Sequence, residues 1–125
     1  DHVWVVHGDG YDEITTTGET KVAELSDGHI RTFTLTPEQV GFKRWTKQDL
    51  RGGEAAYNAE ALRAMLGGAP GAFRETVLMN AGAGLVVAGK AARLEDGIAI
   101  AADAIDSGKA TAVLDRLVKV SNEAL

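Results

Sequence analysis

The sequence contains no cysteine, which excludes a disulfide framework, a thiolate metal site and a cysteine nucleophile. It is also short of positive charge, because 13 lysines and arginines stand against 18 aspartates and glutamates. The net charge of −5 argues against a surface that collects nucleic-acid phosphates, since such surfaces carry basic stripes. We therefore expect no nucleic-acid partner, and the lack of cysteine fits a reducing cytoplasm.

Long hydrophobic runs are missing as well. The longest, residues 77–88, is interrupted by Asn80 and falls short of the roughly 20 residues that cross a bilayer. No basic segment followed by an apolar one opens the chain, so secretion is not indicated. We expect a buried helix over 77–88 and no membrane partner. Asn80 should hydrogen-bond a loop there, because an unsatisfied buried amide costs on the order of 1–3 kcal/mol.

The 125 residues are 45% apolar and 25% charged, which is the balance of one globular domain or of part of one. The chain starts at Asp1, without methionine, and enters an apolar run within two residues. That start predicts a piece of a longer protein.

The first third of the chain predicts strands. Residues 3–6 are apolar and β-branched, which is typical of a central strand covered on both sides in an α/β sheet. Residues 7–13 then form a loop at the end of this strand, where α/β sheets bind ligands. Residues 21–25 and 29–35 should pair as a hairpin through Asp27-Gly28. In the second hairpin strand, Phe33 and Leu35 should share one face and Ile30 and Thr32 the other. A short helix opens at residues 36–38, after which three apolar residues should pack on the core: Val40, Phe42 and Trp45.

The remainder predicts four helices. An apolar stripe (Ala55, Ala59, Leu62, Met65, Leu66) should be stopped by Gly67-Gly68. The second helix starts at Pro70 and runs through 88, with small residues at 81–84 that allow close packing. Two further helices are expected over 94–107 and 109–122, separated by Gly108. The fold class is therefore α/β.

Asp12 and Glu13 are the strongest site candidates. Adjacent carboxylates in a loop flanked by glycine can turn toward one divalent ion, whereas in a regular strand they would point to opposite faces. Mg²⁺ suits such a pair, since it takes one or two protein carboxylates and completes its shell with water and phosphate oxygens. The alternative is a solvated acidic loop without a ligand. Arg51 and Lys90 could bind phosphate, although salt bridges with the many acids are the commoner role for such residues.

A longer string favours the metal. Residues 7–13 (His-Gly-Asp-Gly-Tyr-Asp-Glu), then Thr17-Gly18 and residues 22–25, resemble the Asp-Glu magnesium segment of the anthranilate phosphoribosyltransferases. Further segments follow in that family's order and spacing: residues 49–53, 58–59, 62, 78–81, 87–91 and 104–110. The resemblance implies the C-terminal portion of a three-layer catalytic domain of the nucleoside phosphorylase and phosphoribosyltransferase type. In that portion a few strands, including a hairpin, precede four helices.

The resemblance also implies an activity. These enzymes join anthranilate to the ribose of phosphoribosyl pyrophosphate and release pyrophosphate, in tryptophan biosynthesis. By that resemblance Asp12 and Glu13 would hold Mg²⁺. His7 ends the predicted strand beside the acid loop, and it and the adjoining Gly8 are candidate substrate contacts. Because the amine of anthranilate is the nucleophile, no residue of the chain is expected to act as nucleophile or base. The bland alternative for His7 is a hydrogen-bonded structural residue.

Several features of the family are missing from the 125 residues. They are the glycine-rich pyrophosphate loop, the Lys-His-Gly-Asn segment, most anthranilate contacts and the helical dimerisation domain. We therefore expect the chain to be inactive alone and to need the N-terminal part of the same protein, in an enzyme that is a homodimer. Two alternatives stay open: a fragment of a pyrimidine nucleoside phosphorylase and a non-catalytic acidic binding module.

Overall fold

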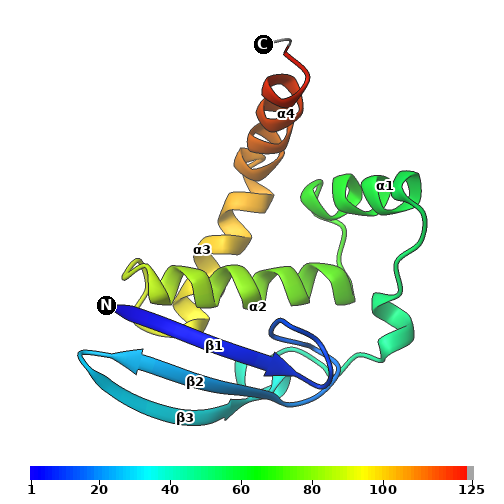
Figure 1. Cartoon of the computed structure of the whole chain (residues 1–125). Coiled ribbons are helices and arrows are strands. Elements are labelled where there is room, and N and C mark those ends of the chain that lie inside the picture. The colour runs from blue at the N-terminus through cyan, green and yellow to red at the C-terminus, as the bar shows by residue number, and fades with distance from the viewer. Residues whose placement is uncertain (124–125) are drawn as a thin grey trace.

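The computed structural model describes residues 1–123, which form a small sheet followed by helices (Figure 1). The strands are β1 (His2–Gly8), β2 (Thr20–Ser26) and β3 (His29–Leu35). Two short 3-10 helices, η1 (Pro37–Val40) and η2 (Lys47–Leu50), lead to the helical part. Its elements are α1 (Ala55–Leu66), α2 (Ala72–Val87), α3 (Leu94–Asp106) and α4 (Lys109–Ser121). The predicted order, a hairpin-containing group of strands before four helices, is confirmed.

The three strands form one antiparallel sheet in the order β1-β2-β3. Asp27 and Gly28 join β2 to β3 with φ angles of 50° and 78°, as a two-residue type I′ turn requires. The predicted hairpin is therefore confirmed. Its alternation is also as expected, because Phe33 and Leu35 are half-buried on the inner face while Ile30 is exposed on the outer one.

The position of β1 corrects the sequence prediction. Among the described residues β1 pairs only with β2, so it lies at an edge of the sheet. Trp4 and Val6 pack against the core, whereas Val3 and Val5 are 44% and 67% exposed. Apolar side chains on both faces favour a strand covered on both sides, but no element within residues 1–123 covers the outer face (Figure 1). For this part of the chain, the prediction of a central strand buried on both faces is wrong.

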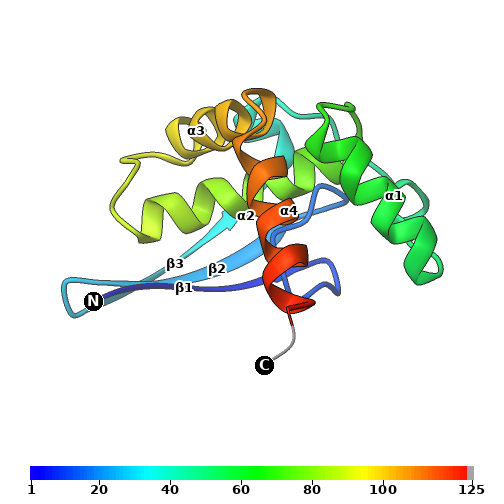
Figure 2. The same cartoon turned by 90° about the horizontal axis from the view of Figure 1, so that it is seen from above.

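The helices cover the inner face of the sheet. α2 lies across that face and α3 packs alongside α2 (Figures 1 and 2). One core cluster joins the sheet to these helices through Ile14, Met79, Ala83 and Leu94, and Val40 and Phe42 pack against it as predicted. A second cluster joins α1, α2 and α3 through Met65, Leu78, Ala101 and Ile105. The chain thus builds a continuous core on one side of the sheet.

Glycine brings α2 and α3 close together. A Cβ atom added to Gly97 would lie 2.4 Å from the Gly82 carbonyl oxygen, far inside van der Waals contact. The close packing predicted for residues 81–84 is confirmed at Gly82 and Ala83, which are buried. Ala81 and Gly84 are exposed instead.

The helix boundaries differ from the prediction in small ways. α1 ends before Gly67 as expected, but Ala55 and Ala59 are exposed, so only the second half of its apolar stripe packs. α2 begins at Ala72, two residues after Pro70.

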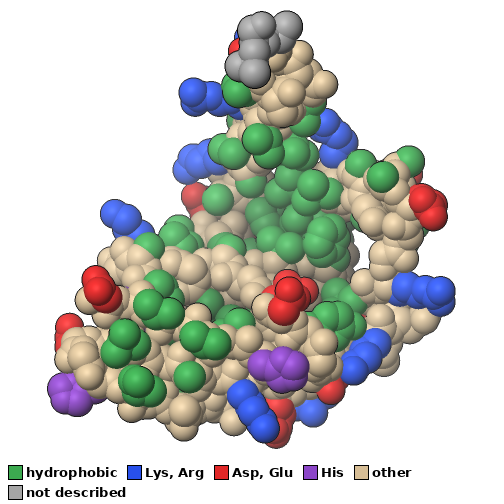
Figure 3. Space-filling view, viewed as in Figure 1, with side chains coloured by type: hydrophobic (Ala, Val, Ile, Leu, Met, Phe, Trp, Pro, Cys, Tyr) green, Lys and Arg blue, Asp and Glu red, His purple; other side chains and the backbone are tan. Residues whose placement is uncertain are grey.

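α4 has no buried residue and projects from the body (Figure 1). Apolar side chains gather in the angle between α4, α1 and α2 (Figure 3). None of the helices within residues 1–123 is both long and apolar enough to span a bilayer.

Candidate metal centre

A tight turn ends β1 and opens the loop of residues 9–19, which carries the predicted acid pair. Asp9 and Gly10 have φ angles of 49° and 92°. On either side of them, Gly8 and Tyr11 exchange backbone hydrogen bonds of 3.1 and 2.8 Å. This is a type I′ turn, the geometry that Asp-Gly favours. The sequence pattern predicts only a loop here, although Asp9-Gly10 is the same dipeptide that predicts the β2–β3 hairpin.

Residues 14–16 anchor this loop to the rest of the molecule. Ile14, Thr15 and Thr16 are at most 1% exposed, which makes them some of the most buried residues described. The Thr15 amide donates to Thr20 Oγ1 at 3.0 Å. The Thr16 carbonyl accepts a hydrogen bond from the Trp45 amide at 2.9 Å. The Trp45 side chain is half-buried. The loop is therefore fixed on its C-terminal side by backbone hydrogen bonds and by an apolar side chain.

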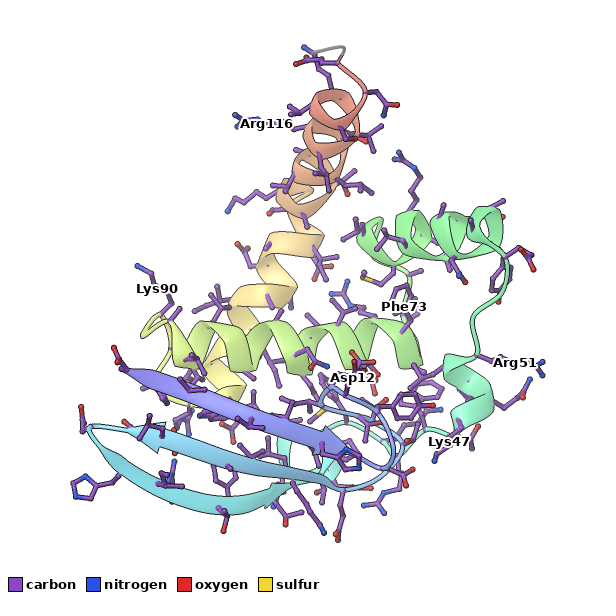
Figure 4. All side chains as sticks on the ribbon, viewed as in Figure 1. Asp12, Lys47, Arg51, Phe73, Lys90 and Arg116 are labelled. Atoms are coloured by element: carbon purple, nitrogen blue, oxygen red, sulfur yellow. The ribbon has the colours of Figure 1, made fainter. Side chains whose placement is uncertain are left out.

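Asp12 and Glu13 are exposed and stand immediately before the anchored segment. Neither forms an ion pair with any residue of 1–123. Figure 4 shows Asp12 in the loop after β1, beside the N-terminal half of α2. The structure thus presents two neighbouring carboxylates, without a competing cation, on a loop whose following residues are held in place.

This donor set fits Mg²⁺. The described part of the chain has no group of three or more histidine, cysteine, aspartate or glutamate residues that could enclose a metal. Mg²⁺ does not need one, because it takes one or two protein carboxylates and keeps water or phosphate oxygens in its other positions. The exposure of Asp12 and Glu13 leaves those positions open to solvent and substrate.

His7 and Gly8 differ in their surroundings. The exposed His7 side chain lines a shallow hollow of about 600 Å³ together with Asp9, Glu19 and Lys21, and the acid pair lies outside this hollow. Gly8 is buried beneath the loop, where an added Cβ would lie 2.6 Å from the Glu13 carbonyl oxygen. Gly8 therefore lets the strand end pass under the acid pair. Contacts of His7 and Gly8 with substrate stay predictions.

The basic residues differ in whether they contact the loop. Lys47 of η2 donates to the Asp9 carbonyl at 2.9 Å and lies 3.3 Å from the Asp9 carboxylate, so it secures the turn. Arg51 and Lys90 form no ion pair within residues 1–123, contrary to the commoner role expected for them. Lys90 follows the C-terminal end of α2, away from Asp12 (Figure 4).

A buried hydrogen-bonded cluster around one acid, Glu24, lies on the inner face of the sheet and was not predicted from the sequence. The Glu24 side chain is 6% exposed and accepts hydrogen bonds from Arg31, from Trp4 Nε1 at 2.8 Å and from the His2 ring at 2.7 Å. The bond with Arg31, followed by that with Trp4, lowers the pKa of Glu24 from 4.5 to about 2. The sign of this cluster in the sequence was an acid in the middle of β2, between apolar residues. The cluster fastens all three strands together.

The fold is that of an α/β domain, with a small sheet covered on one face by helices. The sequence profile described as glycosyl transferase family, a/b domain, matches residues 1–111. The chain therefore belongs to the glycosyl transferase family that this α/β domain defines.

Relatives within the family are anthranilate phosphoribosyltransferases, which confirms the resemblance seen in the motifs. The chain is 75% identical over 122 residues to the enzyme of Mesorhizobium japonicum, covering 98% of the chain and 36% of the relative. It is 58% identical over 120 residues to that of Brucella ovis, covering 96% and 35%. The chain thus spans about a third of the length of the curated relatives it matches.

Solved structures confirm the fold class. The crystal structure of anthranilate phosphoribosyltransferase from Thermus thermophilus superposes with a TM-score of 0.85 at 39% identity, over 94% of this chain and 35% of that one. The Saccharomyces cerevisiae enzyme in complex with phosphoribosyl pyrophosphate and Mg shares the fold with a TM-score of 0.79 at 24% identity, over 90% and 33%.

Proposed function

We propose that residues 1–125 are the C-terminal part of the catalytic α/β domain of an anthranilate phosphoribosyltransferase. The complete enzyme would transfer the phosphoribosyl group of phosphoribosyl pyrophosphate to anthranilate and release pyrophosphate, in tryptophan biosynthesis. The observation that carries this proposal is 75% identity to the Mesorhizobium japonicum enzyme over 98% of the chain. A helical N-terminal domain, a homodimer and a cytoplasmic location belong to the same proposal and rest on the resemblance.

Within that enzyme, Asp12 and Glu13 would hold Mg²⁺ against phosphoribosyl pyrophosphate. When bound, the ion supplies positive charge that offsets the charge gathering on the departing pyrophosphate. A complex of the yeast enzyme with this substrate and Mg supports the proposal, together with the exposure of both carboxylates and the lack of an ion pair to either of them within residues 1–123. The chain itself contributes the placement of these carboxylates, through the turn at Asp9-Gly10 and the anchored residues that follow. The incoming amine of anthranilate is the nucleophile, so this part needs no nucleophile of its own.

The function is tested on the full-length enzyme with purified substrates. Pyrophosphate release that requires both anthranilate and Mg²⁺ is the expected result. Phosphate-dependent cleavage of a pyrimidine nucleoside would instead assign the chain to the nucleoside phosphorylases, and no turnover with either substrate set would favour a binding module. The 125-residue chain alone should be inactive in both assays.

A segment exchange tests the chain directly. Replacing the matching 122-residue segment of the Mesorhizobium japonicum enzyme with this chain should leave anthranilate-dependent turnover largely intact, because the two segments are 75% identical. The matched control is the same chimera carrying Asp12→Asn and Glu13→Gln. Its turnover should fall by about one to three orders of magnitude, because both proposed metal ligands lose their charge. Turnover near that of the unmodified chimera would contradict the metal role.

A further inference from the structure

Asn80 of α2 binds the backbone of Ile14, two residues after Asp12 and one after Glu13. Its Oδ1 accepts from the Ile14 amide at 3.0 Å and its Nδ2 donates to the Ile14 carbonyl at 2.7 Å. The second proton of Nδ2 is donated to the Thr76 carbonyl, one turn earlier in the same helix, at 2.9 Å. Both donors and the oxygen of the carboxamide are therefore engaged, and its plane is fixed.

A second contact reinforces the first. Thr76 lies four residues before Asn80, so both side chains are on one face of α2. The Thr76 hydroxyl shares a 2.8 Å hydrogen bond with the Thr16 hydroxyl, and both residues are at most 5% exposed. α2 therefore holds the loop at Ile14 and at Thr16, through side chains that stand 60 to 66 residues away in the sequence.

These contacts decide where the acid pair can lie. On its N-terminal side the pair follows the turn at Asp9-Gly10, and on its C-terminal side it is joined to Ile14, whose amide and carbonyl are both held by Asn80. The carboxylates of Asp12 and Glu13 have no partner of their own within residues 1–123 that would orient them. Without Asn80, the backbone next to Glu13 would lose two hydrogen bonds at once.

We propose that Asn80 is a positioning residue that orients Asp12 and Glu13 for a divalent cation through the backbone of Ile14. This inference rests on the proposed function. Because the polar atoms of its carboxamide are engaged by the backbone of Ile14 and Thr76, Asn80 acts through the loop. Ligand-positioning groups of this kind tune metal affinity, and their removal weakens it by about 10- to 100-fold.

The test is the affinity of the full-length enzyme for Mn²⁺, used as a paramagnetic probe of the Mg²⁺ site and measured by EPR titration, together with the Mg²⁺ dependence of turnover. Asn80→Ala removes the clamp, and Asn80→Asp keeps its shape while replacing the amide donor by a carboxylate oxygen that faces two carbonyls. Both Asn80 variants should bind Mn²⁺ about tenfold more weakly than wild type. They should also raise the free Mg²⁺ concentration for half-maximal activity by about tenfold, and excess Mg²⁺ should restore most of kcat. A wild-type Mg²⁺ requirement in folded Asn80→Ala would overturn the proposal.

Leu78→Ala is the matched control for lost stability. Leu78 is 5% exposed on the same helix and packs with the second core cluster, away from the loop. This variant should lower the melting temperature and leave the Mg²⁺ requirement unchanged. An equal rise in the Mg²⁺ requirement in Leu78→Ala would reduce Asn80 to a general contributor to folding and would also overturn the proposal.

If Asn80→Ala does not fold, Asn80→Asp carries the test, because it keeps the size of the side chain and removes only the amide that donates to the Ile14 and Thr76 carbonyls. An unchanged requirement there would overturn the proposal. The double variant Asp12→Asn, Glu13→Gln distinguishes the two hypotheses. If it loses activity while Asn80→Ala matches wild type, only the positioning role fails; if it matches wild type, the metal role itself fails.

Discussion

Gly97 of α3 rests directly on the backbone of Gly82 of α2, and this contact sets how closely the two helices approach. A Cβ on Gly97 would lie 2.4 Å from the Gly82 carbonyl oxygen and 2.9 Å from its Cα, and backbone atoms cannot swing aside as a side chain can. Both core clusters include residues of α2 and α3, so a displacement of α3 would be felt in each.

Gly97→Ala should therefore destabilise the enzyme, by on the order of 1–3 kcal/mol, because it overpacks this contact. Thermal unfolding of the full-length protein measures the effect. Gly84→Ala is the control in the neighbouring helix, since nothing within residues 1–123 lies within 4 Å of its Cβ position. It should be neutral or stabilising by up to about 1 kcal/mol, as helix propensity favours alanine. Similar losses in both variants would mean that the glycine contact is not what limits α2–α3 packing.

Gly8 offers a way to displace the acid pair without touching a carboxylate. Gly8→Ala would place a Cβ 2.6 Å from the Glu13 carbonyl oxygen and 2.8 Å from Thr15 Cγ2, so the loop must move away from β1. We expect a raised Mg²⁺ requirement with a smaller change in the KM for phosphoribosyl pyrophosphate. Kinetics over a grid of both concentrations separate the two effects. The reverse pattern would instead support the direct substrate contact predicted for Gly8.

The lowered pKa of Glu24 predicts that the stability of the folded protein depends on pH in the acid range. Its pKa in the folded protein is about 2, below the ordinary value of 4.5, chiefly because of the Arg31 bond. A lowered pKa means that the ionised form stabilises the fold, so this contribution is complete above about pH 4.5 and is lost as pH falls toward 2.

The comparison of wild type with Glu24→Gln isolates that contribution. The melting temperature of wild type should exceed that of the variant at neutral pH, and the difference should shrink between about pH 4.5 and 2. Glu38 is the control acid, because it also has a lowered pKa through Arg44 but its side chain is half exposed. Glu38→Gln should change the melting temperature little. A difference in melting temperature between wild type and Glu24→Gln that stays constant across this pH range would mean that the ionised form of Glu24 does not stabilise the fold.

Local signals predicted most of the secondary structure. Asp27-Gly28 fixed the hairpin, Gly67 and Gly108 marked helix ends, and apolar periodicity located the four helices to within a few residues. The same signals could not reveal which elements meet. Whether β1 is central or at an edge depends on the strands beside it, and the contact of Gly82 with Gly97 depends on how two helices cross.

The site was predictable in part for similar reasons. Asp12 and Glu13 form a contiguous pair, so their exposure on one loop followed from the sequence. Asn80 was expected to bond a loop, because its amide stands in an apolar helix, and the structure identifies that loop as the one carrying the acid pair. Glu24 escaped notice, because its three partners come from β1 and β3 and its spacing to them has no fixed pattern.

The bare edge of β1 has a practical consequence for handling this segment. Apart from those of Gly8, its outward backbone amides and carbonyls are unpaired within residues 1–123, and Val5 and Ile30 lie 67% and 76% exposed on the adjoining outer face. Edges of this kind recruit further strands, and bare aliphatic surface promotes the same association. Recombinant preparations limited to these residues should therefore tend toward inclusion bodies, and co-expression with the N-terminal part proposed above should reduce this tendency.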